Sequence, residues 1–452
     1  MPIEPVVEPA AVRVKIGIDA AITAKHQVAV RETAADGSVT TQRFAVSPTL
    51  AGLEVLSTRL ARYPGAVAVA EPTSMTWLPL ALSVSEAGGQ LALVGARHAA
   101  RLRGAISAKN KSDVIDADVL ARAGEVFDLT PLVLPTPAEL ALRRAVTRRA
   151  AGVLDGNRSW RRLISLGRWA FPDLWIAFGG SLPTATAVLG RWPRLDQLAA
   201  ARRSSLTAVV AEHTRAVTDV PDRVERIRGA ARDWARFWDG RLDLDALGWE
   251  VTEQLADLAA ANDRVRRATG QATTYWERLY GDDPLLVSLP GMGPVTAPAV
   301  RAFLGDGSRF STAKAAASYV GITPSNWSSG TTNQPSRAIT KEGPAALRLA
   351  FYLAANAARH SDPQLADLYH RLMTRAGHCH TQATIAVARK LAERTWTVLH
   401  RGVPYQLQDP DGQPITTRAA KTLIAQRFTV PEEIRKRARA RSAATHRSKL
   451  TR

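Results

Sequence analysis

Four acidic residues stand where their side chains could share divalent cations. Asp19 closes the apolar run IGID, and Glu71 closes the short apolar run AVAVAE. Asp113 and Asp116 lie in KSDVIDADVLA with a spacing that places both on one face of a helix. Clustered carboxylates repel one another unless a cation lies between them, and hard divalent ions prefer oxygen ligands. Two such ions can stabilise the attacking and leaving oxygens of a phosphodiester, so the pattern predicts a phosphoryl-transfer site.

The elements that would position these carboxylates alternate between strands and helices. Strands are expected at 12–20, 25–32, 39–46, 66–71 and 90–96, and helices at 47–60, up to about 88, and near 111–126. This order, β-β-β-α-β-α-β-α, is that of the α/β RNase H-like (RuvC-like) fold, which we assign to residues 12–126. Asp19 and Glu71 would then end adjacent strands.

Each acidic residue alone has a plainer interpretation. An Asp at the end of a strand is usually a turn former, and an acidic pair three residues apart is usually a solvated helix face. Asp118 lies on a different face of the expected helix from Asp113 and is not counted with the four. The combination favours a site for two magnesium ions, with manganese as the alternative.

The charge of the chain favours a nucleic-acid partner. Lys and Arg number 60 against 41 Asp and Glu, which gives a net charge of +19, and the pI is near 10.7. Neutralising phosphates releases counterions, so a strong basic excess promotes binding to nucleic acid. The alternative is a merely basic protein without this partner. The candidate contacts are Arg143, Arg144, Arg148, Arg149, Arg158, Arg161, Arg162, Arg337 and Lys341.

Other global features restrict the class of protein. The single cysteine, Cys379, excludes an intramolecular disulfide framework. No apolar run approaches the roughly 18–20 residues of a membrane span, and the first residues lack the pattern of a secretory signal. We therefore expect a soluble cytoplasmic protein, associated with the nucleoid if it binds DNA, and no membrane partner.

The middle region, 137–282, is expected to be helical. Its apolar residues recur with helical spacing in two sets, which are Leu247, Val251, Leu255, Leu258 and Val265, and earlier Val224, Ile227, Ala231, Trp234 and Trp238. The spacing predicts an antiparallel or dimeric coiled coil, interrupted near Gly240 and Gly248. Packing within one chain explains the same stripe equally well.

The third region, 284–402, is expected to be mainly α-helical. The turn Pro290-Gly291-Met292-Gly293 resembles a helix-hairpin-helix, in which backbone N–H groups approach a phosphate. A polar loop follows between Ile322 and Ile339. The remainder, 403–452, ends in a basic tail from Arg435, for which we expect disorder unless it is bound. His378, Cys379 and His380 are a weak zinc candidate, and helix-end residues are the favoured interpretation.

Both halves of the chain resemble the DEDD-type transposases of the insertion-sequence family numbered one-ten, whose members are bridge-RNA-guided recombinases. The N-terminal resemblance lies in GIDA, VAVAEPTSMTW and KSDVIDADVLA. The C-terminal resemblance lies in LPGMGPVTA, YVGITPSNWSSG, AITKEGPAALR and ATIAVARKL. It covers about residues 12–126 and 285–400, and the order of the two blocks makes it specific.

The resemblance implies roles for particular residues. Asp19, Glu71, Asp113 and Asp116 would form the metal site, and the catalytic serine would be Ser329, with Ser328 as the adjacent alternative. No neighbouring His or Asp marks a hydrolase triad, so the serine would be activated by metal or by nearby cations such as Arg337 or Lys341. Pro335 stands where the family commonly has a glycine-rich stretch, which puts the geometry of the loop in question.

The favoured function is that of a transposase or DNA recombinase that cuts and rejoins DNA of a mobile insertion sequence. The resemblance further implies that serine and carboxylates come from different protomers of a dimer or tetramer. It also implies that a noncoding guide RNA pairs with donor and target DNA. Two alternatives remain, a RuvC-like structure-specific nuclease that needs no serine, and a non-catalytic nucleic-acid-binding protein.

Overall fold

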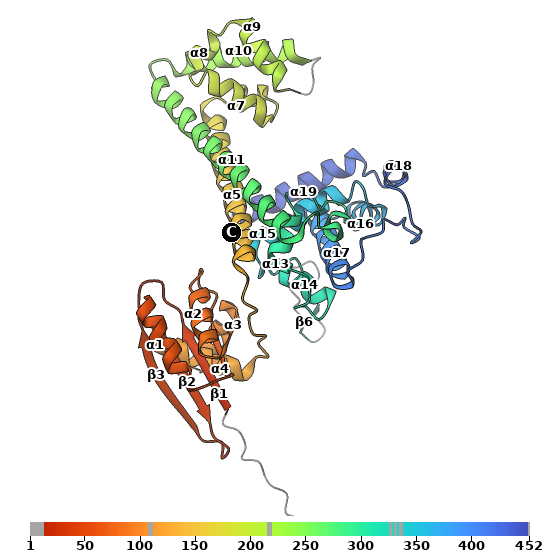
Figure 1. The fold of residues 1–452 in the computed structure, drawn as a ribbon. Helices are drawn as coiled ribbons and strands as arrows, with labels where there is room; N and C mark the ends of the chain where they lie inside the picture. The colour runs from red at the N-terminus through yellow and green to blue at the C-terminus, as the bar shows by residue number, and fades with distance from the viewer. Residues whose placement is uncertain are drawn as a thin grey trace, which may run out of the picture. The chain divides into compact units, whose positions relative to one another are not determined.

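The computed structural model describes residues 13–106, 112–214, 219–324, 328–329, 332–333 and 338–450, and for 328–329, 332–333 and 443–450 it describes the backbone alone. The chain divides into two compact units, Met1–Thr136 and Pro137–Arg452. The first unit contains a sheet with helices, and the second is almost entirely helical (Figure 1). No helix in the described ranges is both long and apolar enough to cross a bilayer.

A five-stranded sheet forms the centre of the first unit, in the order β3-β2-β1-β4-β5. Its strands are β1 (Arg13–Asp19), β2 (His26–Thr33), β3 (Val39–Val46), β4 (Val67–Ala70) and β5 (Gln90–Leu93). β2 is antiparallel to both β1 and β3, whereas β4 pairs in parallel with β1 and with β5. This order and these directions are consistent with the RNase H-like fold that the sequence predicts.

Helices cover both faces of this sheet (Figure 1). They are α1 (Leu50–Leu60), α2 (Trp77–Glu86), α3 (Ala96–Ile106) and α4 (Asp113–Val126). Successive residues of a strand face opposite sides, so Ile16 and Ile18 join the core with α1 and α2 while Gly17 faces α4. The sequence pattern did not predict α3, because only Ala99 of this helix is buried and the apolar repeat is missing.

Gly17 allows α4 to lie very close to β1. A Cβ atom at this position would stand 2.0 Å from the carbonyl oxygen of Ala117 and 2.3 Å from the amide nitrogen of Ala121. Because α4 begins with Asp113 and also carries Asp116, this close approach brings the acidic first turn toward the end of β1.

We expect Gly17→Ala to destabilise the first unit by about 2–4 kcal/mol, because overpacking against backbone atoms cannot be relieved by rotating a side chain. Thermal unfolding of the full chain measures the effect. Gly104→Ala is the matched control, since a Cβ atom there meets nothing within 4 Å and alanine favours a helix. Equal melting temperatures for the two variants would contradict this account of the packing.

Two long helices form the centre of the second unit. α5 (Pro137–Ala170) and α11 (Leu244–Tyr280) run antiparallel along each other (Figure 1). Glycines permit their close contact, because a Cβ atom at Gly152 would meet the side chain of Val265 at 2.9 Å, and one at Gly156 would meet Ala261 at 3.6 Å. The apolar stripe of α11 therefore packs within its own chain along this stretch.

A group of shorter helices packs at one end of the α5–α11 pair. They are α6 (Pro172–Ala177), α7 (Leu182–Arg191), α8 (Leu195–Ala199), α9 (Arg203–Glu212) and α10 (Val220–Trp238). The earlier apolar set, including Val224 and Ile227, is buried in this group together with Leu247 and Val251 of α11. Gly240 does separate α10 from α11, but the expected interruption at Gly248 is wrong, because α11 continues through that residue.

The rest of the second unit lies around a second hydrophobic core, to which α5 and α11 also contribute residues. Its elements are α12 (Pro284–Val287), α13 (Ala297–Leu304), α14 (Ala313–Val320), β6 (Ser328–Ser329), β7 (Thr332–Asn333), α15 (Ala345–Ala358), α16 (Pro363–Thr374), α17 (His380–Arg401), α18 (Thr417–Arg427) and α19 (Glu432–Leu450). The turn at Gly291, for which phosphate contact stays a prediction, lies against α15. A Cβ atom there would stand 2.2 Å from the carbonyl oxygen of Ala354, and the N–H of Gly293 donates to the hydroxyl of Thr296 at 2.9 Å.

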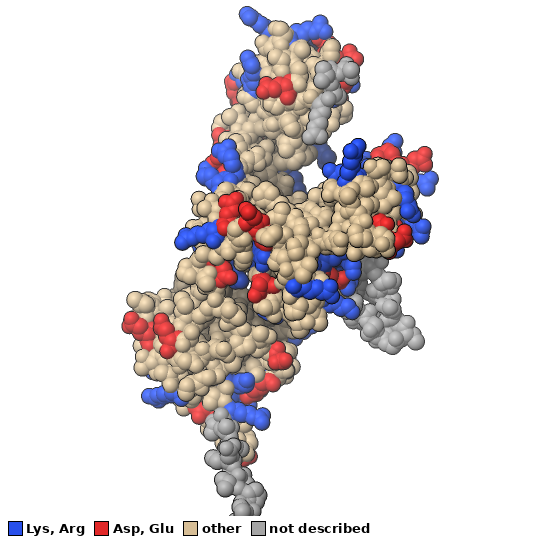
Figure 2. Space-filling model, turned by 45° about the vertical axis from the view of Figure 1, so that its right-hand side comes forward, with Lys and Arg blue, Asp and Glu red and all other residues tan. Residues whose placement is uncertain are grey.

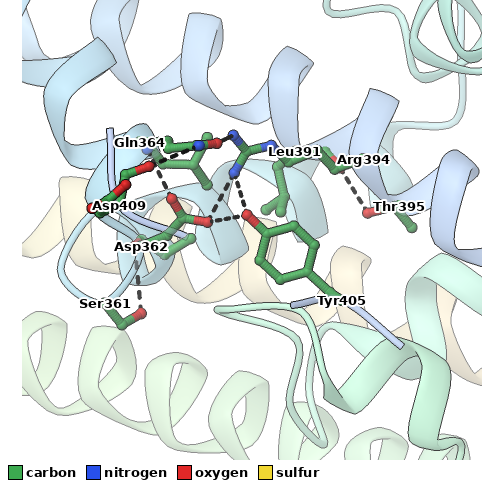
Figure 3. A network of polar contacts seen from close by, with 10 residues as sticks. Ser361, Asp362, Gln364, Leu391, Arg394, Thr395, Tyr405 and Asp409 are labelled. Carbon is green, nitrogen blue, oxygen red and sulfur yellow. Dashed lines mark hydrogen bonds and ion pairs between the residues drawn. The ribbon is translucent and has the colours of Figure 1, made fainter. Parts of the chain in front are cut away.

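A buried polar network holds the segment after α17 in place (Figure 3). The carboxylate of Asp362, which is fully buried, accepts hydrogen bonds from the guanidinium of Arg394 at 2.8 Å and the hydroxyl of Tyr405 at 2.7 Å. Gln364 donates to the backbone carbonyl of Asp409 at 2.9 Å. Burial and the nearby Asp362 carboxylate raise the pKa of Tyr405, which keeps its hydroxyl a donor. The network satisfies its own charges, so we assign it a structural role.

The expected disorder of the basic tail is wrong over the part that the structure describes. Residues Glu432–Leu450 form α19, and this helix contacts α16 and α17. Ala438 is buried, and Val430 just before the helix is buried with it in the shared core. The apolar residues that make these contacts are few, and they stand among many arginines, so the sequence pattern did not indicate a packed helix.

Candidate active site

The four predicted acidic residues lie at one edge of the sheet in the first unit. Ile18 of β1 pairs with Ala70 of β4, so Asp19 at the end of β1 and Glu71 directly after β4 stand at the carboxyl ends of neighbouring parallel strands. The first turn of α4 supplies Asp113 and Asp116.

The start of α4 is fixed by a cap. The hydroxyl of Ser112 accepts a hydrogen bond from the backbone N–H of Ile115 at 3.3 Å. A capped helix N-terminus carries partial positive charge, which favours carboxylates in its first turn. The local sequence thus stabilises two acidic residues next to the sheet edge.

The electrostatics of the site reflect this crowding. The pKa of Asp19 is raised to about 6, mainly by burial and then by the nearby carboxylates of Asp116, Asp113 and Glu71, while Arg103 opposes them. Asp116 is 7 % exposed. Half-buried carboxylates that lie close together repel one another, so a nearby positive charge stabilises their ionised forms.

Arg103 of α3 supplies part of this positive charge. The sequence analysis did not identify this residue. Its Nε donates a short hydrogen bond to Oδ1 of Asp116, and its terminal nitrogen lies 3.9 Å from Oε1 of Glu71. Only the position of α3 reveals this pairing. The single available signal was a basic segment, ARLRGA, shortly before the acidic helix.

The donor set suits a hard divalent cation. All four side chains offer oxygen, the ligand type that magnesium and manganese prefer. In the described ranges no three His, Cys, Asp or Glu side chains are already gathered as a coordination shell, and Arg103 lies among the carboxylates instead. A cation at this site would therefore replace Arg103 as the partner of Asp116.

We expect Arg103→Met to make the stability of the protein depend on metal. In chelator the variant should lose about 1–3 kcal/mol, because a nearly buried carboxylate is left without its cation. Added Mg²⁺ should recover most of the loss, so the Mg²⁺-dependent rise in melting temperature should exceed that of the unmodified chain.

Arg43→Met provides the control for this comparison. Arg43 forms an ion pair of 2.9 Å with Asp118, and its side chain is 50 % exposed. An exposed pair contributes under about 1 kcal/mol, so its loss should be small and insensitive to Mg²⁺. The same pair shows that Asp118, set aside in the sequence analysis, is engaged away from the four acidic residues. If Mg²⁺ stabilised both variants equally, the carboxylate cluster would not be a metal site.

The serine loop belongs to the second unit. Ser329 lies in β6 and pairs with Thr332 of β7, and a bridge between Pro324 and Ile339 closes the base of the loop. Lys341 is exposed and follows that base with a positive φ of 57°. Arg337 lies outside the described residues. The structure thus brings the four acidic residues together in one unit and places Ser329 in the other.

The predicted arginine contacts of α5 divide into engaged and exposed residues. Arg143 donates to a backbone carbonyl of α13 at 2.6 Å, Arg149 to the hydroxyl of Thr269 at 3.0 Å, and Arg158 to the carboxylate of Asp155 at 3.0 Å. Arg144, Arg148, Arg161 and Arg162 are exposed, and Arg158 is exposed as well as paired. In Figure 2 basic and acidic side chains are scattered over the visible face, so the net charge alone does not locate a binding surface.

Two of the exposed arginines lie in a groove between the long helices. Arg144 and Arg148 of α5 line it together with Arg264, Arg267 and Tyr275 of α11, and its volume is about 530 Å³. We call these residues the α5–α11 groove. Arginine forks and an aromatic ring suit a nucleic-acid strand, whose phosphates and bases they contact respectively.

The His-Cys-His segment follows the helix-end interpretation. Cys379 is the N-cap of α17 and His380 its first residue. Nδ1 of His380 lies 2.8 Å from the hydroxyl of Tyr369. No zinc-binding group of three ligands is found in the described ranges.

Comparison with known proteins matches both halves of the chain. Residues 283–370 match a family model described as "Transposase IS116/IS110/IS902 family", and residues 16–172 match the DEDD-type IS110 model, described as "Transposase". Together they contain the four acidic residues and Ser329.

Individual relatives agree with the family models. The "Mini-circle putative transposase for IS117" of Streptomyces coelicolor is 31% identical over 306 residues, which is 65% of this chain and 70% of the relative. An insertion element IS116 protein of Streptomyces clavuligerus is 28% identical over 397 residues, 86% of this chain and 94% of the relative. The pilin gene-inverting protein of Moraxella lacunata is 31% identical over 121 residues, 27% of this chain and 38% of the relative. The chain belongs to the IS110/IS116 family of transposases.

Proposed function

We propose that this protein recombines DNA, cutting and rejoining strands with the acidic site and a serine nucleophile. The observation that carries the proposal is the convergence of Asp19, Glu71, Asp113 and Asp116 at one sheet edge, with the pKa of Asp19 raised. Relatives named as transposases and as a gene-inverting protein support DNA as the substrate.

In the proposed reaction, the Oγ atom of Ser329 attacks a phosphorus atom of the DNA backbone. One strand oxygen leaves with a proton as a hydroxyl, and a phosphoserine diester forms in its place. A hydroxyl of the second strand then attacks this phosphorus and releases the serine, so the number of phosphodiester bonds is conserved. Magnesium or manganese, held by the four carboxylates, would stabilise charge on the oxygens that attack and leave.

The chain's own groups would prepare this reaction. The carboxylates hold charge at the sheet edge, and Arg103 neutralises Asp116 until a cation replaces it. With a cation in that place, the guanidinium of Arg103 would become available to a phosphate oxygen. Lys341, exposed beside the base of the serine loop, would lower the cost of forming a serine alkoxide.

We further propose that the catalytic assembly is a dimer or tetramer in which serine and carboxylates come from different protomers. Mixing two inactive variants, Ser329→Ala and Asp116→Asn, tests this arrangement. If the residues act across protomers, mixed oligomers should recover part of the activity. If each site is built within one protomer, the mixture should stay inactive.

A noncoding guide RNA is the proposed source of sequence choice. Base pairing would then select the donor and target DNA while the protein recognises the nucleic-acid backbone, and the α5–α11 groove is a suitable contact surface. Sequencing the RNA that copurifies with the protein from its native host tests this. One abundant RNA from the flank of the gene is the expected result, whereas sequence-random RNA would argue against a guide.

The two other functions predict different products. A RuvC-like nuclease would release free ends without a protein–DNA adduct, and its cleavage would survive Ser329→Ala. A non-catalytic nucleic-acid-binding protein would cut no strand with any divalent metal, and its binding would be insensitive to magnesium. Incubation with supercoiled donor and target DNA, followed by denaturing gels, distinguishes all three.

A further inference from the structure

A basic pocket lies in the second unit, and it shares no lining residue with the α5–α11 groove. α15 is followed by Arg359, α16 contributes Tyr369, and the start of α17 contributes Cys379 and His380. α19 contributes Arg435 and Arg439, one helical turn apart. The volume is about 420 Å³. We call these residues the α19 pocket.

The positive charge of the α19 pocket is not neutralised within the described ranges. Among the residues that the structure describes, no carboxylate lines the pocket. In those ranges neither Arg359 nor Arg435 forms an ion pair, and Arg439 has only the exposed Glu432 at 3.5 Å. Three guanidinium groups thus converge on one cavity with a single, solvent-screened counter-charge.

Contacts with neighbouring side chains fix the position of the Arg359 guanidinium. Its guanidinium lies over the ring of Tyr369 at 4.5 Å, and its Nε donates to Oδ1 of Asn356 at 3.1 Å. The hydroxyl of Tyr369 is in turn within 2.8 Å of Nδ1 of His380. Burial lowers the pKa of Arg359, and the pKa of His380 is lowered by burial and then by the three arginines. These groups therefore feel a positive potential that an anion would relieve.

The pocket has apolar as well as basic walls. Met373 and Ala438 line it beside the ring of Tyr369. Its volume falls in the roughly 300–1,000 Å³ range of small-molecule sites, which is more space than a single phosphate needs. Arginine forks match phosphate oxygens, and an aromatic or sulfur-bearing wall suits a base or a sugar.

We propose that the α19 pocket binds one nucleotide unit of a nucleic-acid strand, with Arg359, Arg435 and Arg439 on its phosphate. The inference rests on the proposed function for the presence of a strand, and it goes beyond that function by giving the C-terminal helix a role. α19 then acts as a clamp that holds a strand against α15 and α17, distant in sequence from Ser329 and from the carboxylates.

Cys379 offers a direct probe, because it is the single cysteine of the chain and lines the pocket. The rate at which neutral iodoacetamide alkylates its thiol is measured on the full-length protein, alone and with a short single-stranded oligonucleotide of mixed sequence. Fluorescence anisotropy on the same samples measures binding of the oligonucleotide. We expect a saturating oligonucleotide to slow alkylation about 10-fold, as a bound ligand excludes the reagent.

Matched variants identify the arginines. Arg435→Gln combined with Arg439→Gln should abolish the protection, whereas Lys436→Gln combined with Arg437→Gln removes the same charge from exposed positions of α19 and should retain it. If the first double variant fails to fold, Arg439→Gln alone, whose side chain is 73% exposed, should still weaken the protection several-fold.

The outcomes separate the possible ligands. Inorganic phosphate and adenosine monophosphate are tested alongside the oligonucleotide. If inorganic phosphate alone protected Cys379 as strongly as the oligonucleotide, the ligand of the pocket would be a free anion rather than a strand. An oligonucleotide that binds in the anisotropy measurement but leaves alkylation unchanged would overturn the pocket while leaving the proposed recombinase function intact. Absence of any oligonucleotide binding would overturn the pocket as a strand-binding site, and the assay with supercoiled DNA would decide the recombinase function separately.

Discussion

Ser329→Ala should abolish the covalent protein–DNA adduct and reduce recombination by about 10³-fold or more, because removing a nucleophile leaves only the binding and electrostatic parts of catalysis. The adduct is measured with labelled DNA on denaturing protein gels, and recombination by counting joined products. Melting temperature, metal binding and DNA binding should stay unchanged, since Ser329 belongs to a short strand of the second unit and the acidic site belongs to the first.

Ser328→Ala is the control for this prediction. It removes a hydroxyl from the neighbouring residue of β6 and should leave both adduct and recombination intact. The reverse result, loss with Ser328→Ala and activity with Ser329→Ala, would move the nucleophile by one residue. Undiminished strand cleavage in both variants would contradict a serine mechanism and favour a nuclease that uses the carboxylates alone.

The second large effect is expected for Asp116→Asn, which should lower strand cleavage by about 10³-fold, comparable to the loss of a main electrostatic group in other active sites. The amide keeps the shape of the side chain but removes the charge that would hold a cation. Cleavage rates at several Mg²⁺ and Mn²⁺ concentrations measure the effect, and isothermal titration measures metal affinity. DNA binding without metal should be retained.

Asp118→Asn is the matched control because it changes the same side chain two residues later in α4. Asp118 is bound to Arg43 rather than to the acidic cluster, so the variant should keep its cleavage rate and its metal affinity. It should lose under about 1 kcal/mol of stability with the partly exposed pair. Similar losses of activity in Asp116→Asn and Asp118→Asn would show that the substitutions disturb the α4 helix in general, rather than removing a metal ligand.

The acidic constellation could be read from the chain because its members are tied to local patterns. Asp19 and Glu71 directly follow apolar runs, and an apolar run of that length predicts a buried strand without knowledge of its partners. Asp113 and Asp116 are three residues apart, and this spacing places both on one face of a helix. The pairing of Ile18 with Ala70 then places the ends of β1 and β4 side by side.

Other features could not be read in this way. The apolar stripe of α11 was compatible with a dimer or with packing in one chain, because its spacing specifies a face but not a partner. In the structure Gly152 and Gly156 of α5 lie close to α11, so the partner of the α11 stripe is a helix of the same chain. The tail was mistaken for a disordered segment, because the contacts that hold Ala438 come from residues far away in the sequence.

The sequence by itself therefore determined the strands and helices of the first unit, apart from α3, and the four acidic residues that these elements carry. Only the tertiary structure decided that Arg103 pairs with Asp116, that Gly17 admits α4 to the sheet, and that arginines from α15 and α19 share a pocket. The physical reason is that periodicity and capping act over a few neighbouring residues, whereas a counter-ion or a pocket wall is chosen by the folding of distant segments against one another.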